Sequence, residues 1–353
     1  MRRSSRSLAT VLRVASITVT LLGAASAQTN DPQRALSFRS VMAPLFAAEP
    51  MDRTAESSMD GAAADSESKG LWPGFISGTR DGFESFPRPV GSPLYFEDPF
   101  INTDIRPLLL YHEFPKDSLL GGGDLTVLAV QARLALTERL QFIATGDGHA
   151  DLESTALPEA EEWNDLAAGL KYAFYVDKEK QAIASVGCRL RLSSGRREVA
   201  QGLEDEVSLF ITGAKKYGRL SVIADLVGRI TTHHGKGNDS LSWDAHASYE
   251  VCEWFHPLVE YHGFYYLSNG DFLLNLGNGV SIPTAGLRDG LLDYGNLGAG
   301  DVAGSSAHWA TVGFRCELKK GVSWGFGYGF ALRRIAENDI FDRRITTNIV
   351  ITF

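Results

Sequence analysis

Four titratable side chains on two neighbouring candidate strands form the first group that could do chemistry. His246 and Glu250 fall on one face of the candidate strand 242–251, because both positions are even. Glu260 and His262 likewise fall on one face of the candidate strand 257–267. Residues two apart on a strand face the same side, so the four side chains could meet. Imidazole and carboxylate groups could there relay protons or hold a metal ion. Their spacing matches no fixed metal-ligand motif, so we predict no metal and no cofactor.

A larger set of charged residues falls on the same face of the candidate strands. Basic residues come first along the chain and acidic residues follow, so a closed sheet would place them on facing walls. Such walls could orient a dipolar permeant and act as a selectivity filter. Alternatively, they could form a salt-bridge network that fills a narrow barrel. The candidate lumen residues are Arg133, Lys171, Arg189, Arg191, Asp225, Asp244, His246, Glu250, Glu260, His262 and Arg315.

A third candidate is the segment Tyr266-Leu267-Ser268-Asn269-Gly270, which is similar to the His-x-Ser-Asn-Gly segment of outer-membrane phospholipases. The resemblance implies that Ser268 would be the nucleophile. Tyr266 stands at the position where those enzymes have the general base. A serine without an adjacent base is a poor nucleophile. We therefore predict that the protein is not an enzyme and keep lipid hydrolysis as an alternative.

The elements that would position these residues are strands in which large apolar residues alternate with polar or small ones. In residues 322–333, Trp324, Phe326 and Tyr328 fall on one face, and Ser323 and Gly325 fall on the other. The pattern predicts twelve strands, at 104–114, 124–136, 140–147, 164–176, 181–192, 205–215, 219–230, 242–251, 257–267, 307–318, 322–333 and 343–353.

The connections between these strands alternate between short and long. Short ones include 137–139, 216–218 and 319–321, whereas long ones include 148–163 and 268–306. An up-and-down barrel with both termini on one side has this alternation, with periplasmic turns and external loops. We therefore predict an all-β fold, a transmembrane antiparallel barrel of about twelve strands.

The segment before the barrel divides into two parts. Residues 1–27 combine Arg2, Arg3 and Arg6 with a short apolar stretch and a final Ala-Ser-Ala, which predicts a signal peptide. Residues 28–103 are predicted to be a disordered or irregular periplasmic lead. Within that lead, residues 72–100 carry scattered aromatic residues, prolines and glycines, and could pack in the barrel mouth or serve only as a tether.

Charge and composition exclude other classes of protein. The net charge of -9 argues against a nucleic-acid partner. No apolar run after the N-terminus approaches the roughly 20 residues that a membrane-spanning helix needs. Cys188, Cys252 and Cys316 form neither a disulfide framework nor a zinc pattern, and at most one pair could bridge.

Residues 104–353 resemble outer-membrane β-barrel proteins as a class. The final strand has Ile349 and Ile351 on one face and ends on Phe353, and it looks like the signal recognised by the barrel-assembly machinery. The resemblance implies location in the outer membrane, contact with its lipid, and a periplasmic N-terminus. The turn Leu136-Thr137-Glu138-Arg139-Leu140 resembles that of transporters associated with aromatic-degradation pathways, which implies an aromatic permeant.

We therefore predict a channel or transporter for small molecules, with a charged lumen and a gate formed by the long loop 268–306. Leucines among the glycines of that loop would avoid water, so we expect it to fold over or into the barrel mouth. The alternatives are a lipid hydrolase of the phospholipase type and a structural barrel without transport.

Overall fold

The structure is a computed structural model, and it describes residues 76, 78–116, 118, 120–232, 237–270, 273–275, 281–283, 293–333 and 341–353. The predicted signal peptide and residues 28–75 lie outside the described residues, so the predicted domain division remains a prediction. No helix of the described residues is long and apolar enough to cross a membrane.

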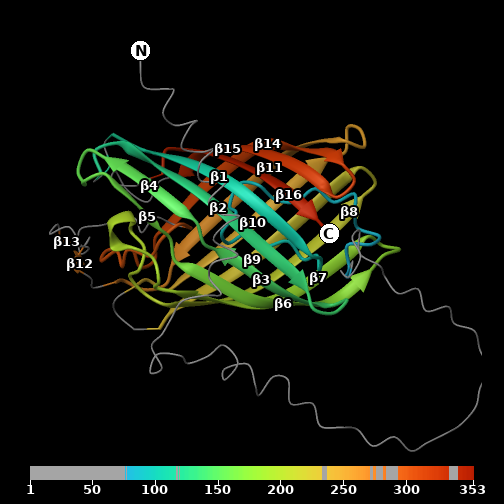
Figure 1. The fold of residues 1–353 in the computed structure, drawn as a ribbon, viewed down its shortest axis with the longest axis horizontal. Coiled ribbons are helices and arrows are strands. Elements are labelled where there is room, and N and C mark those ends of the chain that lie inside the picture. Colours follow the sequence, from blue (N-terminus) through green and yellow to red (C-terminus); the bar gives the residue numbers. More distant parts are fainter. Residues whose placement is uncertain are drawn as a thin grey trace, which may run out of the picture. The chain divides into compact units, whose positions relative to one another are not determined.

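Within the described residues, a single antiparallel sheet closes on itself through the pairing of its first two strands. Of its fourteen strands, β4 and β5 branch off at one end, and the other twelve form the ring. The ring comprises β1 (Asp104–Phe114), β2 (Gly123–Ala135), β3 (Leu140–Gly146), β6 (Leu166–Asp177), β7 (Ala182–Leu192), β8 (Glu206–Tyr217), β9 (Leu220–Thr231), β10 (Ser240–Tyr249), β11 (Phe255–Tyr266), β14 (Ser306–Lys319), β15 (Val322–Arg333) and β16 (Arg343–Thr352). Figure 1 shows these strands tilted side by side around the barrel. The predicted all-β, twelve-stranded antiparallel barrel is confirmed.

The predicted strand limits agree with the ring strands to within two residues at each end. The sequence prediction missed four short strands inside the predicted loops. They are β4 (His149–Ser154) and β5 (Ala160–Trp163), which continue the sheet beside β2, and β12 (Leu273–Asn275) and β13 (Ser281–Pro283), which pair with each other. A short 3-10 helix, η2 (Arg197–Val199), lies between β7 and β8.

The two ends of the barrel differ in the length of their connections. The turn end carries the short connections 136–139, 178–181, 218–219, 250–254 and 320–321. The loop end carries the long connections 115–122, 147–165, 193–205, 232–239, 267–305 and 334–342. The start of β1 and the end of β16 both lie at the turn end, where the Phe353 amide donates to the Thr103 carbonyl at 2.9 Å. In Figure 1 the C-terminus marks the turn end, and β4, β5, β12 and β13 mark the loop end.

Along the strands, apolar side chains point out and polar ones point in. On β16, Ile345 and Ile349 are exposed, whereas Arg344, Thr346 and Asn348 are buried. On other strands Leu209, Val259 and Val312 are about half exposed. A water-soluble sandwich would bury these residues, so the barrel exterior suits an apolar solvent.

Residues 78–103, here called the plug segment, fill the barrel interior. Pro87, Pro89, Pro93 and Pro99 interrupt this segment, and because proline has no backbone N–H it cannot continue a ladder of strand hydrogen bonds. The segment forms none of the named strands, yet most of its residues from Phe86 onward are buried. Of the two alternatives left by the sequence, packing against the barrel applies to these residues.

Candidate functional site

The plug segment enters at the turn end, reaches toward the loop end and returns. Near its start, Gln181 of the turn end donates to the Gly82 carbonyl at 2.7 Å. Near its middle, the Tyr95 hydroxyl donates to Glu206 at the first residue of β8 at 2.9 Å. The plug then ends at Thr103, beside the C-terminus. Because both of its ends lie at the turn end, it could leave the barrel without threading through it.

An aromatic cluster anchors the plug at its base. The rings of Phe83, Phe86 and Phe100 lie 5.2 to 5.9 Å apart, and all three are almost completely buried. They pack against inward-facing small or aliphatic residues, including Ala173 and Ile183. The small wall residues leave room for the rings, so burial of apolar area stabilises this part of the plug.

Higher in the barrel, the basic wall holds the carboxylate of Glu97. Arg133 on β2 donates twice, from Nε to Oε1 at 2.9 Å and from Nη2 to Oε2 at 2.8 Å. Lys171 on β6 donates from Nζ to Oε1 at 2.8 Å, and Arg189 on β7 lies 3.8 Å from Oε2. These ion pairs and hydrogen bonds offset the cost of removing the buried charges from water.

A second ionic cluster lies next to this one, toward the turn end. Asp98 of the plug is 3.4 Å from Arg106 of β1 and 3.6 Å from Arg88. Arg88 in turn donates to Asp104 at 2.5 Å. The plug therefore supplies two acidic side chains, Glu97 and Asp98, and one basic side chain, Arg88, to these clusters.

The acidic wall receives backbone N–H groups of the plug. Glu260 on β11 accepts from the Val90 amide at 2.9 Å and from the Gly91 amide at 2.6 Å. His246 Nδ1 lies 2.8 Å from Glu260 Oε1, the oxygen that also accepts the Val90 amide. A Cβ at Gly91 would come 2.3 Å from Thr311 Oγ1 and 2.6 Å from Glu260 Oε2, so only glycine fits this approach.

A row of titratable groups continues across β11, β10 and β9. His262 lies 3.7 Å from Glu260 and forms a hydrogen bond with Asp244. Asp244 pairs in the ladder with Asp225, which accepts the Glu97 amide at 2.9 Å. No group of three or more potential metal ligands was found within the described residues. The row therefore contacts the plug at Glu260 and at Asp225.

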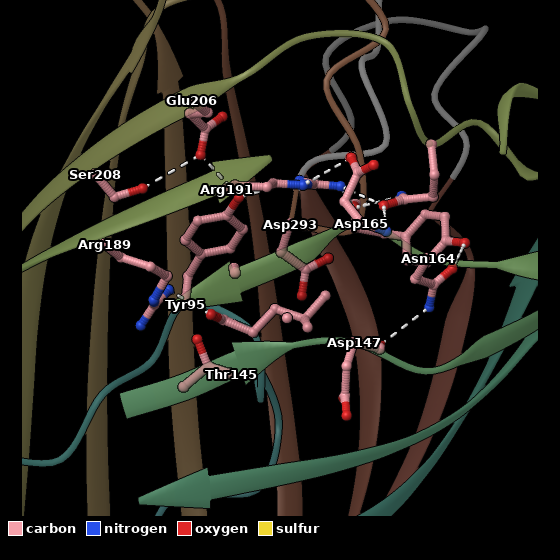
Figure 2. Close-up of a pocket in the computed structure, with 15 residues that line it drawn as sticks. Tyr95, Thr145, Asp147, Asn164, Asp165, Arg189, Arg191, Glu206, Ser208 and Asp293 are labelled. Carbon is pink, nitrogen blue, oxygen red and sulfur yellow. Dashed lines mark hydrogen bonds and ion pairs between the residues drawn. The ribbon is translucent and has the colours of Figure 1, made fainter. Parts of the chain in front are cut away.

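A pocket lies at the loop end, above the middle of the plug. Figure 2 shows Arg191 pointing across it toward Asp165, to which its Nε donates at 3.2 Å. Arg191 also donates to Gln201 at 2.6 Å and to the Tyr294 carbonyl at 2.7 Å. The cavity is small, about 30 Å³, which is room for about two water molecules. The plug and these side chains together narrow the path at this level.

Asp147, just after β3, lines the same pocket and has a shifted pKa. Its Oδ1 accepts the Val130 amide at 3.2 Å. Burial raises the pKa of Asp147 to about 6, and the Val130 hydrogen bond offsets only part of that rise. The carboxyl group is therefore close to titration at neutral pH.

The described part of the long loop also packs inward. Asp293 accepts two hydrogen bonds from Arg344 of β16, at 2.6 and 2.7 Å, and both side chains are buried. The buried Tyr294 hydroxyl donates to Asn164 at 2.7 Å. Residues 284–292 lie outside the described residues, as do most others between 271 and 283. The gate predicted for the whole loop remains a prediction.

Most of the candidate lumen residues lie inside the barrel. The buried or nearly buried ones are Arg133, Lys171, Arg189, Arg191, Asp225, Asp244, His246, Glu260, His262 and Arg315. Glu250 differs, because β10 ends at Tyr249 and Glu250 pairs at the barrel rim with Lys216 at 2.8 Å. The predicted strand therefore ran past the end of β10, and the lumen role of Glu250 remains a prediction. Alternation placed it correctly by parity, but the strand ends one residue too early.

Sequence reasoning missed the partners of these residues. Arg344, Arg229 and Glu206 share the inward parity of their strands, and the same rule would have found them. Glu97 and Asp98 had no such signal, because they lie on irregular backbone. Their only clue was the aromatic content of the segment around them.

Ser268, the candidate nucleophile, performs a structural role at the end of β11. Its Oγ accepts the Asp239 amide at 2.8 Å. Tyr266 is buried in the core of the loop end, and His262 is engaged inside the barrel with Asp244. Among the described residues, none of the contacts of Ser268 is with a histidine.

No protein-family model matches the chain, and no curated protein matches it in sequence. Among solved structures, the NanC porin has a TM-score of 0.43 and 8% identity, covering 71% of this chain and 98% of its own. The KdgM porin in complex with disordered oligogalacturonate has a TM-score of 0.38 and 9% identity, covering 72% and 99%. The translocator domain of the autotransporter NalP from Neisseria meningitidis has a TM-score of 0.38 and 13% identity, covering 74% and 91%. This chain is similar to these barrels, but at such scores the similarity carries no argument about permeant or mechanism.

Proposed function

We propose that the protein is an outer-membrane channel for small molecules, which the plug segment closes in the conformation described here. The observation that carries the proposal is a barrel that is apolar outside and polar inside. Exposed Leu209, Val259 and Val312 suit lipid, whereas buried Arg133, Lys171 and Glu260 suit a water-filled path. An interior meant only as a packed core would not need these charges.

The gate in this proposal is the plug rather than the long loop alone. The plug contacts the walls through side chains and single backbone groups, and among the described residues no ladder of strand hydrogen bonds ties it to the barrel. The described part of the long loop adds a second closure through Asp293 and Arg344. Opening requires that the plug segment withdraw toward the turn end. It also requires that the contact between Asp293 and Arg344 break at the loop end.

The proposed orientation places the turn end in the periplasm and the loop end outside the cell. It follows from the short turns, the shared position of both ring termini, and the final strand carrying Ile349, Ile351 and Phe353. In this orientation the barrel-assembly machinery would recognise the final strand, and lipid would surround the apolar exterior. A tag near Asn278 should be reachable by antibody on intact cells, whereas one near Lys320 should not. Reversed labelling would overturn the orientation.

The proposed function is tested by single-channel conductance in planar bilayers. The full chain is compared with a variant lacking residues 28–100 and with one lacking residues 271–303. We expect the full chain to be mostly silent and the plug deletion to give discrete conductance. A plug deletion that forms a folded, heat-modifiable barrel but stays silent would refute the channel.

Two alternatives remain. A structural barrel without transport is favoured by one observation, the filled interior, and a silent plug deletion would support it. A lipid hydrolase would need a base for Ser268, whose Oγ accepts a backbone amide instead. The hydrolase alternative would be supported if the wild type released fatty acid from phospholipid vesicles and Ser268→Ala did not. The aromatic permeant suggested by the turn 136–140 remains a prediction.

A further inference from the structure

We propose that Arg133, Lys171 and Arg189 form a carboxylate-binding site in the conducting path, and that the plug residue Glu97 occupies it in the closed state. The ligand class is small acidic amino acids and their short peptides. This inference rests on the proposed channel function, and it specifies the class of solute that the open channel would bind.

The carboxylate contacts have the geometry of a built site. Arg133 approaches Glu97 with two parallel N–H donors, at 2.9 and 2.8 Å, the fork that matches a carboxylate. Lys171 adds a third contact at 2.8 Å. The side chains of Arg133 and Lys171 have no exposed surface, and that of Arg189 has 3%. A surface ion pair formed by chance would not be buried so completely.

The wall retains unused donors at this site. Arg133 Nη1 and Arg189 Nε make no hydrogen bond within the part of the chain that the structure describes. Withdrawal of the plug would remove Glu97 and Asp98 together and leave Asp104, 3.7 Å from Arg133, as the nearest acid of the wall. Three cations would then face the water-filled lumen, where their positive potential attracts anions. An anion entering the lumen would replace the lost carboxylates.

The wall also recognises the backbone of Glu97, which narrows the ligand class. Asp225 accepts the Glu97 amide at 2.9 Å, and Thr212 Oγ1 donates to the Glu97 carbonyl at 2.7 Å. A free acidic amino acid offers the same three groups. Its side-chain carboxylate would face Arg133, its ammonium would face Asp225, and its α-carboxylate would accept from Thr212. A simple inorganic anion would use only the first of these contacts.

The first test is chemical rescue of the full-length Glu97→Ala variant. That substitution removes Cγ and the carboxylate, the fragment that acetate restores. We expect a lower urea midpoint in detergent micelles than for the wild type, and a saturable recovery with acetate at constant ionic strength. Acetamide, which has the same shape without the charge, should give no recovery.

Matched variants separate the site from a general salt effect. Glu84→Ala removes an exposed plug carboxylate outside the site, and acetate should not change its midpoint. Adding Arg133→Met to Glu97→Ala should abolish the recovery. If Glu97→Ala does not fold alone, the yield of folded barrel with acetate against acetamide is the measurement. Equal effects of acetate on Glu97→Ala and Glu84→Ala would overturn the proposed site.

The second test measures solute preference in the variant lacking residues 28–100, reconstituted in liposomes. L-glutamate should enter faster than L-glutamine, and Arg133→Met should reduce the ratio of the two rates. Conductance without preference for glutamate would refute the ligand class and leave the channel intact. Absence of any permeation would refute the channel, and the rescue experiment would then decide the site alone.

Discussion

Replacing Glu260 with alanine tests whether the plug docks as one unit. Glu260 accepts the Val90 amide at 2.9 Å and the Gly91 amide at 2.6 Å, both buried. A hydrogen bond to a charged group contributes about 1.5–3 kcal/mol, so losing two would cost plug docking about 3–6 kcal/mol. That is roughly a 10²- to 10⁴-fold rise in the undocked population.

Hydrogen exchange measured by mass spectrometry reports this population directly, because buried amides exchange only when the plug undocks. The informative amides are those that Glu260 does not touch. The Phe96 amide donates to the Ser92 carbonyl at 2.9 Å, and the Glu97 amide donates to Asp225 at 2.9 Å. If the plug docks as a unit, Glu260→Ala should lower their protection by the same factor as at Val90.

The control is Glu250→Gln, at the barrel rim. Glu250 pairs with Lys216 at 2.8 Å in a partly exposed position, so its loss should cost less than about 1 kcal/mol. Phe96 and Glu97 should keep their protection in this variant. The reasoning fails if Glu260→Ala exposes only Val90 and Gly91 while Phe96 and Glu97 stay protected, because the plug would then open piecemeal.

Three further predictions follow from the same contacts. Gly91→Ala places a Cβ 2.3 Å from Thr311 Oγ1, and overpacking of this kind should weaken docking by about 1–3 kcal/mol, measured as increased conductance of the full chain. Burial raises the pKa of Asp147 to about 6, so its contribution to stability is complete below its ordinary value of 3.8 and is lost as the pH rises through about 6. Asp147→Asn should therefore match the wild type in the free energy of unfolding by urea near pH 3 and exceed it, by up to about 3 kcal/mol, near pH 8; a constant difference across this range would contradict the assignment. Asp293→Ala leaves Arg344 buried without its bidentate partner, which should cost about 3–5 kcal/mol and speed hydrogen exchange in residues 293–305, whereas Arg344→Met in the same chain should recover part of the loss.

The barrel could be predicted from sequence because each of its strands faces two different solvents. A residue such as Trp324 and its neighbour Ser323 must lie on opposite faces, and this period of two is visible along the strand. The same rule placed Arg133, Lys171 and Glu260 inside the barrel. Their inward direction follows from parity alone, and no knowledge of their partners is needed.

The plug could not be predicted in this way, because its contacts join residues far apart in the sequence. Val90 and Glu260 are 170 residues apart, and Glu97 and Asp225 are 128 apart. Irregular backbone has no period that marks a buried face, and the prolines resemble those of a linker. The β4 and β5 extension was missed for a related reason, since four- and six-residue strands are too short to stand out in a polar loop.

The position of the plug changes how the two charged walls are understood. The sequence left two hypotheses, a transverse field and a network of salt bridges between the walls. In the middle of the barrel the closest partners belong to the plug, with Glu97 on the basic wall and the Val90 and Gly91 amides on the acidic wall. The charges on each wall are therefore complementary to the plug rather than to the facing wall. Withdrawal of the plug would leave both walls unpaired, so water, ions or a solute with the same pattern of charge would have to replace it.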